Sequence, residues 1–480
     1  MTIPELVFIL CLCIPLLSVY AFASSVPSGN PLVQYYQRPS DSPPYPERPR
    51  FLVLKGSWYE MGKQYGEGAG DYMRAGFNLD YLESLEAFGK EHVWYDVGLW
   101  EKAIQAYSPQ IVEFLKGMSD GAAGELVKSK YQEVGNYQKV LFLVTRQARK
   151  FRHPAWKHWP PGCSCLLVGG AGTKDGKVLY AHNRDTSMIS MMWNVAFLTQ
   201  PSDPRANKFW SHGGAGTLGY HFVNDKGLAL SNNWGGLPAS KGSSSDLLDF
   251  GIPFEILLFH TAAYAKSTPE AVELATRGTP EYAQATGRST VAITGSCTFS
   301  LADRQGNLTI VERLARYYAI RRPGDLGEPR DFIVTTNHNT PIKFYDENLR
   351  LTNELMTKFS TDTPGKSSSN RYWTLWWLIE KNFGRIDGDL AQEFLKSHFF
   401  IDKDGKRTDS INTDKYGSVS AHLNPAGETV CAHHGFPENY ANYGTMESTV
   451  VLLGEKETEF RWSHGRPCHW QGPWDRLILK

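Results

Sequence analysis

The stretch WPPGCSCLLVGGAGTKDGKVLYAHNRD, from Trp159 to Asp185, decides the fold. Two prolines and a glycine end the preceding segment, and two short apolar runs, CSCLLV and KVLYAHN, follow them. Short apolar runs bounded by turn residues are typical of β-strands, and the Asp175-Gly176 pair between them is a hairpin signal. The stretch therefore predicts a β-hairpin whose first strand begins at Cys163.

The chain before this hairpin has a different pattern. Apolar residues recur at helical spacing through Tyr72–Phe88 and again through Tyr131–Phe151. Residues 24–50 are rich in proline and serine, which predicts an extended lead-in rather than a helix or strand. We therefore expect a mainly helical part over residues 51–162.

The chain after the hairpin continues with strands in two batches and helices between them. Strands are predicted in the runs WNVAFLTQ, YHFVND, GLALSNN, TVAITGSCTFSLAD, NLTIVERL, DFIVTTN, STVVLLG and EFRWSHG, and helices at 254–265, 269–277, 371–382 and 390–397. This order favours a layered α+β sandwich over a doubly wound parallel sheet. We expect residues 163–480 to form this part of the fold.

The composition excludes two broad classes of protein. The 480 residues are 41% hydrophobic, which is too apolar for a disordered chain. The 50 Lys and Arg balance the 50 Asp and Glu, so the chain lacks the positive charge by which proteins release counterions from nucleic acid. No nucleic-acid partner is expected.

An apolar run from Leu6 to Ala23 opens the chain, and Ala21-Phe22-Ala23 at its end fits the small-x-small rule for signal peptidase. We expect a signal peptide over residues 1–23, no stable membrane span after its removal, and secretion or delivery to a lysosomal or vesicular lumen. The run lacks a basic start, so an uncleaved anchor is the alternative. The sequon at 307–309 fits a secreted glycoprotein.

Five cysteines follow the apolar run, at Cys163, Cys165, Cys297, Cys431 and Cys468. An odd number in an oxidising compartment suggests one free, reactive thiol and two disulfides among the other four. The alternative is that all five are buried, reduced cysteines that pack as small apolar residues. The sequence leaves both open.

Cys163 is the position most suggestive of chemistry. A Gly162-Cys163 bond held in a kinked segment could undergo an N→S acyl shift, because the thiol can reach the preceding carbonyl. Cleavage there would give Cys163 a free α-amino group with a pKa of roughly 7.7–8.0, which could act as the general base for its own thiol. The alternative is that Cys163 and Cys165 are ordinary cysteines at a strand edge.

Several further motifs occur in a fixed order along the chain. Gly162-Cys163-Ser164 is followed by a strand, a turn and a second strand that ends in His182-Asn183-Arg184-Asp185. Other landmarks are GSWYEMGKQYGEGAG at 56–70, VNDKGL at 223–228, FIVTTNH at 332–338 and SSNR at 368–371. From Gly56 to Cys468 the chain resembles cysteine N-terminal-nucleophile (Ntn) hydrolases, in particular the isopenicillin N acyltransferase-like (acyl-CoA:6-aminopenicillanate acyltransferase) family.

The resemblance implies an αββα four-layer sandwich of two mainly antiparallel sheets. It identifies Cys163 as the nucleophile exposed by self-cleavage after Gly162. It implies that Asp185 holds the new α-amino group near the thiol and that Arg371 pairs with this carboxylate. Taken singly, Asp185 could instead cap a turn, and Arg371 could be a solvated residue at a helix start.

The resemblance also implies an oxyanion hole. Asn337 matches the residue whose side-chain amide donates to the tetrahedral intermediate, although it could simply close a strand. Asn232 or Asn233 is the candidate for a second polar group there. The penicillin V acylase and bile-salt hydrolase branch has an arginine where this chain has His182, so its substrate preference does not transfer.

These observations predict a secreted precursor that cleaves itself between Gly162 and Cys163 into two chains that stay together. The product would be an amidohydrolase or acyltransferase that acts on acyl amides through a thioester. The alternatives are a phospholipase B-like lipid acyl hydrolase of the same fold and a catalytically silent secreted binding protein. No cofactor is expected, and no metal, since His433-His434 beside Cys431 lacks a second ligand pair at zinc spacing.

Overall fold

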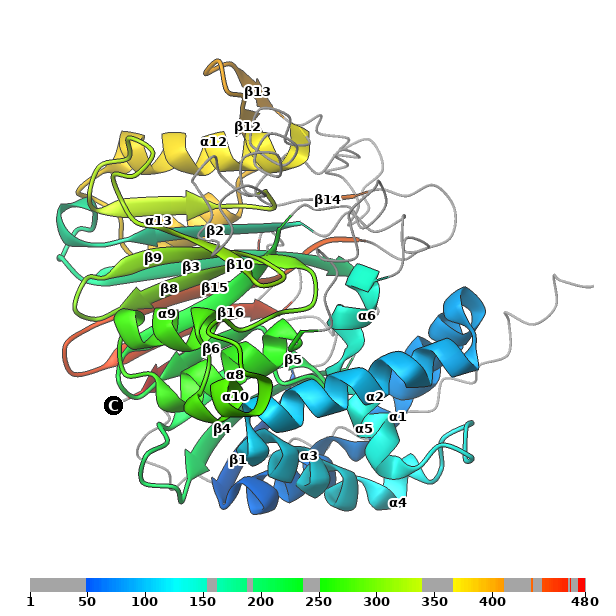
Figure 1. Ribbon diagram of the computed structural model, residues 1–480. Helices are drawn as coiled ribbons and strands as arrows, with labels where there is room; N and C mark the ends of the chain where they lie inside the picture. The colour runs from blue at the N-terminus through cyan, green and yellow to red at the C-terminus, as the bar shows by residue number, and fades with distance from the viewer. Residues whose placement is uncertain are drawn as a thin grey trace, which may run out of the picture. The chain divides into compact units, whose positions relative to one another are not determined.

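Two β-sheets lie face to face, and helices cover the outer face of each (Figure 1). The computed structural model describes residues 49–152, 162–187, 193–235, 251–338, 366–409, 433–434, 443–464, 467 and 474–479. All of them belong to one compact unit within residues 31–480. The αββα sandwich expected from the sequence is confirmed.

The first sheet has eight strands. Neighbouring strands in it are antiparallel, except for β1 and β4, which are parallel. In spatial order the strands are β1 (Arg50–Gly56), β4 (Asn194–Pro201), β5 (Phe209–Gly214), β6 (His221–Asn224), β7 (Leu228–Trp234), β8 (Ser296–Asp303), β9 (Leu308–Leu314) and β10 (Tyr317–Arg321). β1 comes from the part expected to be mainly helical, so both halves of the chain build this sheet.

The second sheet is antiparallel and carries the hairpin expected from the sequence. Its strands are β11 (Phe332–Thr335), β2 (Cys163–Val168), β3 (Val178–Ser187), β15 (Tyr443–Leu453), β16 (Thr458–His464) and β17 (Trp474–Leu479), with β14 (His433–His434) paired to β15. A short 3₁₀ turn at Gly170–Gly172 precedes the Asp175-Gly176 turn of the hairpin. A separate hairpin is made by β12 (Phe399–Ile401) and β13 (Arg407–Asp409).

Helices form two outer layers. The layer on the first sheet contains α1 (Trp58–Phe88), α2 (Lys90–Tyr107), α3 (Pro109–Gly121), α4 (Ala123–Leu126), α5 (Asn136–Val144), α6 (Arg146–Arg152), α8 (Phe254–Tyr264), α9 (Thr268–Thr276) and α10 (Pro280–Thr286). The layer on the second sheet contains α12 (Lys366–Asn382) and α13 (Gly388–Leu395). In Figure 1 these two layers lie at opposite sides of the paired sheets.

Alternation along β2 fixes which side chains face the other sheet. Cys165 and Leu167 belong to the core between the sheets, whereas Leu166 and Val168 pack against α12 and α13. Because side chains two residues apart share a face of a strand, Cys163 also faces the space between the sheets. The first residue of the hairpin therefore lies at the end of the inter-sheet core.

The glycines of the motif at 56–70 are packing residues. A Cβ atom on Gly62 or Gly66 would lie 2.0 Å or 2.3 Å from a backbone oxygen of α3, and one on Gly117 would lie 2.0 Å from a backbone oxygen of α1. The two helices can approach this closely only where both lack side chains. These glycines therefore allow α1 and α3 to pack closely in the helix layer.

The helix layer contains elements that the sequence interpretation missed. α1 begins at Trp58 instead of Tyr72, because close packing on α3 offsets the low helix propensity of its glycines. α2 buries Val93, Val97, Trp100 and Ile104 at helical spacing, a signal that was present in the sequence. α12 begins at Lys366, so Arg371 lies inside the helix and not at its start.

The alternative with two disulfides is wrong for this chain. It needs four bonded cysteines, but Cys163, Cys165 and Cys297 are all free and buried. Cys165 lies in the core between the sheets and Cys297 in the core under the helices, so the first sheet separates them. Cys431 and Cys468 lie outside the described residues.

The signal peptide predicted over residues 1–23 lies outside the described residues, and so does nearly all of the lead-in predicted over residues 24–50, because residues 1–48 are not described. Within the described part of the chain, no helix is both long enough and apolar enough to cross a bilayer.

Candidate active site

The site is built around the first residue of β2. Cys163 is 5% exposed and stands directly opposite Arg184 of β3 in the strand pairing. Its side chain points into the gap between the sheets, at the end of the core. Cys163 is a free cysteine at a strand end, and the charges of Asp185, Arg184 and Arg371 act on its thiol.

The peptide bond between Gly162 and Cys163 is held on both sides. The carbonyl oxygen of Gly162 accepts a hydrogen bond from the backbone N–H of Asp185 at 2.7 Å. The backbone N–H of Cys163 donates to Oδ1 of Asn337, also at 2.7 Å. A Cβ atom on Gly162 would lie 1.8 Å from Oδ2 of Asp185, so only glycine fits here beside the carboxyl group.

Asn337 and Arg371 form a clamp on this bond. Arg371 donates through Nη2 to Oδ1 of Asn337 at 2.8 Å, and through Nη1 to the carbonyl oxygen of Cys163 and to Oγ of Ser164. Nδ2 of Asn337 donates to the carbonyl oxygen of Trp234 at 2.9 Å. Its amide therefore has one orientation, with the oxygen toward Cys163 and the nitrogen toward β7.

Ser368 explains the spacing of the SSNR motif. Its Oγ accepts the backbone N–H of Asn337 at 2.8 Å and lies 2.7 Å from Nδ1 of His338. Ser368 and Arg371 are one helical turn apart, so both reach Asn337 from the same face of α12. The motif holds this asparagine by its backbone and by its side chain.

Asp185 is buried and shares the surroundings of Cys163. Burial raises the pKa of its carboxyl group to about 6, although the charge of Arg371, the hydrogen bond from Thr445 and the charge of Arg184 act in the opposite direction. Oγ1 of Thr445 donates to Oδ1 at 2.6 Å. A carboxyl group with this pKa can take up or release a proton near neutral pH.

The thiol of Cys163 is protonated in this state. Burial, with a smaller contribution from the negative charge of Asp185, raises its pKa to about 12. The positive charges of Arg184 and Arg371 and a hydrogen bond from the backbone of Asp185 lower it in part. The thiol therefore needs a nearby base before it can attack a carbonyl.

The structure separates the two asparagines at the end of β7. Leu228 and Leu230 face the helix layer, so Asn232 does too. Asn233 faces the second sheet, where Nδ2 donates to the carbonyl oxygen of Thr335 at 3.4 Å. Only Asn233 lies on the side of Cys163 and Asn337.

Sequence reasoning missed the groups around Arg184. Its Nη1 donates to Oε2 of Glu447 at 2.8 Å, and its guanidinium carbon lies 3.6 Å from the centre of the Tyr220 ring. Glu447 and Thr445 lie on β15, more than 250 residues after Cys163, and no motif marks them. Only the pairing of β3 with β15 brings them to the site.

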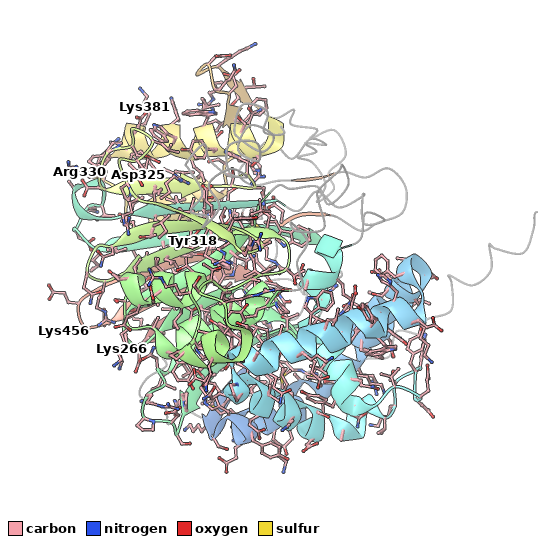
Figure 2. All side chains as sticks on the ribbon, in the orientation of Figure 1. Lys266, Tyr318, Asp325, Arg330, Lys381 and Lys456 are labelled. Carbon is pink, nitrogen blue, oxygen red and sulfur yellow. The ribbon has the colours of Figure 1, made fainter. Side chains whose placement is uncertain are left out.

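Buried charge distinguishes this region from the surface. In Figure 2 the labelled Lys266, Lys381 and Lys456 lie at the outer edges of the layers, and all three are exposed. By contrast, Asp185 is 5% and Arg371 is 1% exposed. Charged side chains are rarely this buried unless they are paired, and clusters of them are typical of functional sites.

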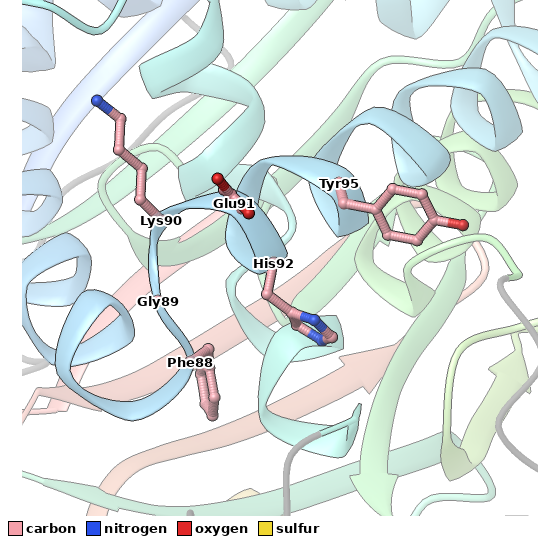
Figure 3. Close-up of a pocket in the computed structure, with 6 residues that line it drawn as sticks. All are labelled: Phe88, Gly89, Lys90, Glu91, His92 and Tyr95. Atoms are coloured by element: carbon pink, nitrogen blue, oxygen red, sulfur yellow. The ribbon is translucent and has the colours of Figure 1, made fainter.

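A pocket of about 500 Å³ lies elsewhere, where α1 meets α2 (Figure 3). Its lining is Phe88, Gly89, Lys90, Glu91, His92 and Tyr95. Figure 3 shows the side chains of Lys90 and Tyr95 pointing apart. None of the site residues expected from the sequence lines it, so we do not place the active site there.

Comparison with known proteins gives matches to solved structures alone. No protein-family model and no curated protein matches the chain. Penicillin V acylase from Agrobacterium tumefaciens is 15% identical over 62% of this chain and 82% of its own, with a TM-score of 0.33. Two variants of conjugated bile acid hydrolase from Clostridium perfringens are 14% identical over 63% of this chain and 89% of their own, with TM-scores of 0.36 and 0.35.

Proposed function

We propose that this chain is the precursor of a cysteine Ntn amidohydrolase, which cleaves itself between Gly162 and Cys163 and then acts on acyl amides. The observation that carries the proposal is the pair of hydrogen bonds on the Gly162-Cys163 peptide bond. Its oxygen is held by the backbone of Asp185 and its nitrogen by the side chain of Asn337, each at 2.7 Å.

This arrangement supports self-cleavage by the following steps. The N–H of Asp185 polarises the Gly162 carbonyl, and the thiolate of Cys163 attacks its carbon. The carbon–nitrogen bond then breaks, a thioester forms, and the nitrogen takes up a proton to become the α-amino group of Cys163. The Asp185 carboxylate, with its pKa near 6, is the buried base placed to receive the thiol proton. Water hydrolyses the thioester and releases the carboxyl group of Gly162.

The same groups then serve a substrate. The new α-amino group keeps the position of the Cys163 backbone nitrogen, next to Oδ1 of Asn337, and takes the proton from the thiol. The thiolate attacks the acyl carbon, and the amine leaves with that proton. One N–H of the Asn337 amide donates to Trp234, and its second N–H is the donor we assign to the oxyanion. Arg371 keeps the asparagine in place.

The second half of the reaction decides between two activities. If water attacks the thioester, the enzyme is an amidohydrolase. If a second amine attacks it, the enzyme is an acyltransferase. The buried groups at Cys163 serve both, so we propose the chemistry of acyl transfer from an amide and leave the acceptor to experiment. A lipid acyl hydrolase would use the same thiol on an ester.

The first experiment is denaturing mass spectrometry of the purified protein beside two variants. Wild type should give two chains, the second beginning at Cys163. Cys163→Ala should stay whole. Cys165→Ala is the matched control, because it removes a thiol from the same face of β2 two residues away, and it should cleave normally.

Uncleaved wild type would refute the precursor mechanism. If cleavage occurs, wild type should be assayed with matched acyl amides and acyl esters, with and without hydroxylamine as a competing amine. Amide hydrolysis with hydroxamate formation is the expected result. Ester hydrolysis alone would support the lipid acyl hydrolase instead, and no turnover of either would support a silent binding protein.

We also propose that the precursor is secreted or enters a lysosomal or vesicular lumen. The support is the apolar run from Leu6 to Ala23 and the cleavage motif at its end. N-terminal sequencing of the expressed protein should find Ser24 as the first residue. A chain that retains Met1 in the membrane fraction would show an anchor instead.

A further inference from the structure

Three buried histidines from both sheets touch one another beside the site. His182 lies on β3, and His212 and His221 face each other across β5 and β6. Nδ1 of His182 lies 2.6 Å from Nε2 of His221, and Nδ1 of His221 lies 2.9 Å from Nε2 of His212. All three side chains are at most 3% exposed. We call them the histidine chain.

One end of the histidine chain contacts Asn233. Nε2 of His182 lies 3.2 Å from Oδ1 of Asn233, while Nδ2 of Asn233 donates to the carbonyl oxygen of Thr335. A backbone carbonyl can only accept, so the Asn233 nitrogen faces Thr335 and its oxygen faces His182. Nε2 of His182 therefore carries the proton.

This contact fixes the tautomers of the whole chain. Burial lowers the pKa of His182 to about 3, that of His212 to about 4 and that of His221 well below its usual value, so all three rings are neutral at pH 7. A neutral ring has one N–H, so Nδ1 of His182 accepts from Nε2 of His221. Nδ1 of His221 likewise accepts from Nε2 of His212. Reversing any ring would set two bare nitrogens, or a nitrogen and an oxygen, against each other.

The far end of the histidine chain lies near Thr449 and Glu447. Nε2 of His212 lies 3.4 Å from Oγ1 of Thr449, whereas its unprotonated Nδ1 is 3.9 Å from Oε1 of Glu447, beyond hydrogen-bond distance. Glu447 is bound by Arg184, the residue opposite Cys163, and by Nδ2 of Asn194. The chain thus runs from the ion pair beside the nucleophile to Asn233.

Asn233 in turn lies where β7 meets the strand that leads to Asn337. Its Nδ2 holds Thr335, and the next residue, Trp234, accepts from Nδ2 of Asn337. These two contacts cross between β7 and β11, so a rotation of the Asn233 amide would disturb both strands at the oxyanion donor. The end of β7 therefore needs a fixed donor to Oδ1 of Asn233.

We propose that His182 is a positioning residue for Asn233, and that His221 and His212 hold it in the Nε2–H tautomer this task requires. The inference rests on the proposed function, because His182 would position Asn233, a residue beside the oxyanion hole of that proposal. A metal ion on His212, His221 and Glu447 is the competing explanation, since their ligand atoms lie within 4.8 Å of one another. The 2.9 Å separation of the two ring nitrogens and the presence of Arg184 on Glu447 favour the hydrogen bond.

Two variants of His182 provide a matched test. In His182→Gln the amide nitrogen can take the place of Nε2 and keep the contact with Asn233, whereas His182→Asn is shorter and keeps only the contact with His221. We expect the Gln variant to retain a kcat close to wild type. The Asn variant should lose roughly tenfold to a hundredfold in kcat at similar KM, less than the roughly 10²–10³ lost when an oxyanion donor is removed.

Each outcome of this test has one meaning. If wild type is active and both variants behave alike, the contact with Asn233 is not what matters and the inference is wrong. If wild type neither cleaves itself nor turns over any amide, the proposed function fails instead.

A second measurement does not depend on activity or on the variants folding. In assigned spectra of wild type labelled with ¹⁵N-histidine, His182, His212 and His221 should each be a neutral Nε2–H ring that does not titrate between pH 8 and pH 5. The signals of His260 and His338, which are also buried, must be assigned separately. An Nδ1–H tautomer at His182 would overturn the inference. So would a stoichiometric metal ion in purified wild type.

Discussion

Oδ1 of Asn337 accepts the backbone N–H of Cys163 at 2.7 Å, so the candidate oxyanion residue already touches the nitrogen that cleavage would free. Residues 174 positions apart in the sequence meet because β11 and β2 are neighbours in one sheet. The same amide oxygen accepts from Arg371 at 2.8 Å. The position of the nucleophile and that of the oxyanion donor are therefore set together.

Gly162→Ala should block self-cleavage. The added Cβ would lie 1.8 Å from Oδ2 of Asp185, so either the carboxyl group or the scissile bond must move. We expect the rate of chain separation on denaturing gels to fall at least about tenfold, which corresponds to about 1.4 kcal/mol of barrier. Gly124→Ala is the control, because nothing lies within 4 Å of its added Cβ. Equal rates for both variants would contradict the close contact.

Arg371→Met should destabilise the precursor by about 3 kcal/mol, because three buried acceptors lose their donor and each such loss costs about 1–3 kcal/mol. Urea unfolding in the Cys163→Ala background measures this on a single chain. Arg371→Lys should recover only part of the loss, since one ammonium group cannot reproduce the planar fork. Arg385→Met, on an exposed arginine after the same helix, should change stability by less than about 0.5 kcal/mol.

Asp185→Asn should change how stability depends on pH. The pKa of Asp185 is raised from 3.8 to about 6, so the folded chain keeps a proton that the unfolded chain has lost. Stability from this group is therefore present below pH 4 and is lost as pH rises through about 6. We would compare Cys163→Ala with the double variant that also carries Asp185→Asn. The double variant should become more stable relative to Cys163→Ala as pH rises from 4 to 6, and the difference should then level off. A difference that shrinks over this range would mean that ion pairing with arginine lowers this pKa.

Asn233→Leu and Asn232→Leu should behave differently although the residues are adjacent. Asn233 bridges His182 and Thr335, so leucine leaves two buried polar groups without a partner and should lower kcat and stability. Oδ1 of Asn232 is buried and has no hydrogen-bond partner among the described residues, so leucine there should cost less than about 1 kcal/mol. Amide turnover and urea unfolding check both. If Asn232→Leu lowered kcat more than Asn233→Leu does, Asn232 and not Asn233 would be the asparagine that serves the site.

Much of the fold could be predicted from local patterns. The hairpin that begins at Cys163 is encoded by two short apolar runs and an Asp-Gly turn, and the two batches of strands indicated the sandwich. The pattern missed the first half of α1, the helices α2, α3 and α10, and the strands β1, β5 and β10. In α1 the glycines have low helix propensity, and the close packing against the facing glycines of α3 offsets it.

The candidate site could be named only by resemblance. Cys163, Asp185, Asn337 and Arg371 were each compatible with an ordinary structural role, and the structure brings all four together at one end of β2. Neither pattern nor resemblance pointed to Glu447, His212 or His221, or to the contact of His182 with them, because these residues lie on strands that are far apart in the sequence.

The sequence by itself determined where the β2–β3 hairpin begins, which face of β2 each residue occupies, and which residue stands first on that strand. Those properties depend on neighbours along the chain, since turn residues and the two-residue period of a strand are local. Only the tertiary structure decided that Asn233 contacts His182 and Thr335 of the second sheet, that Arg184 meets Glu447, and that Asp185 is buried enough to titrate near pH 6. Burial and charge pairing depend on which strands become neighbours, and that is a property of the packed sheets as a whole.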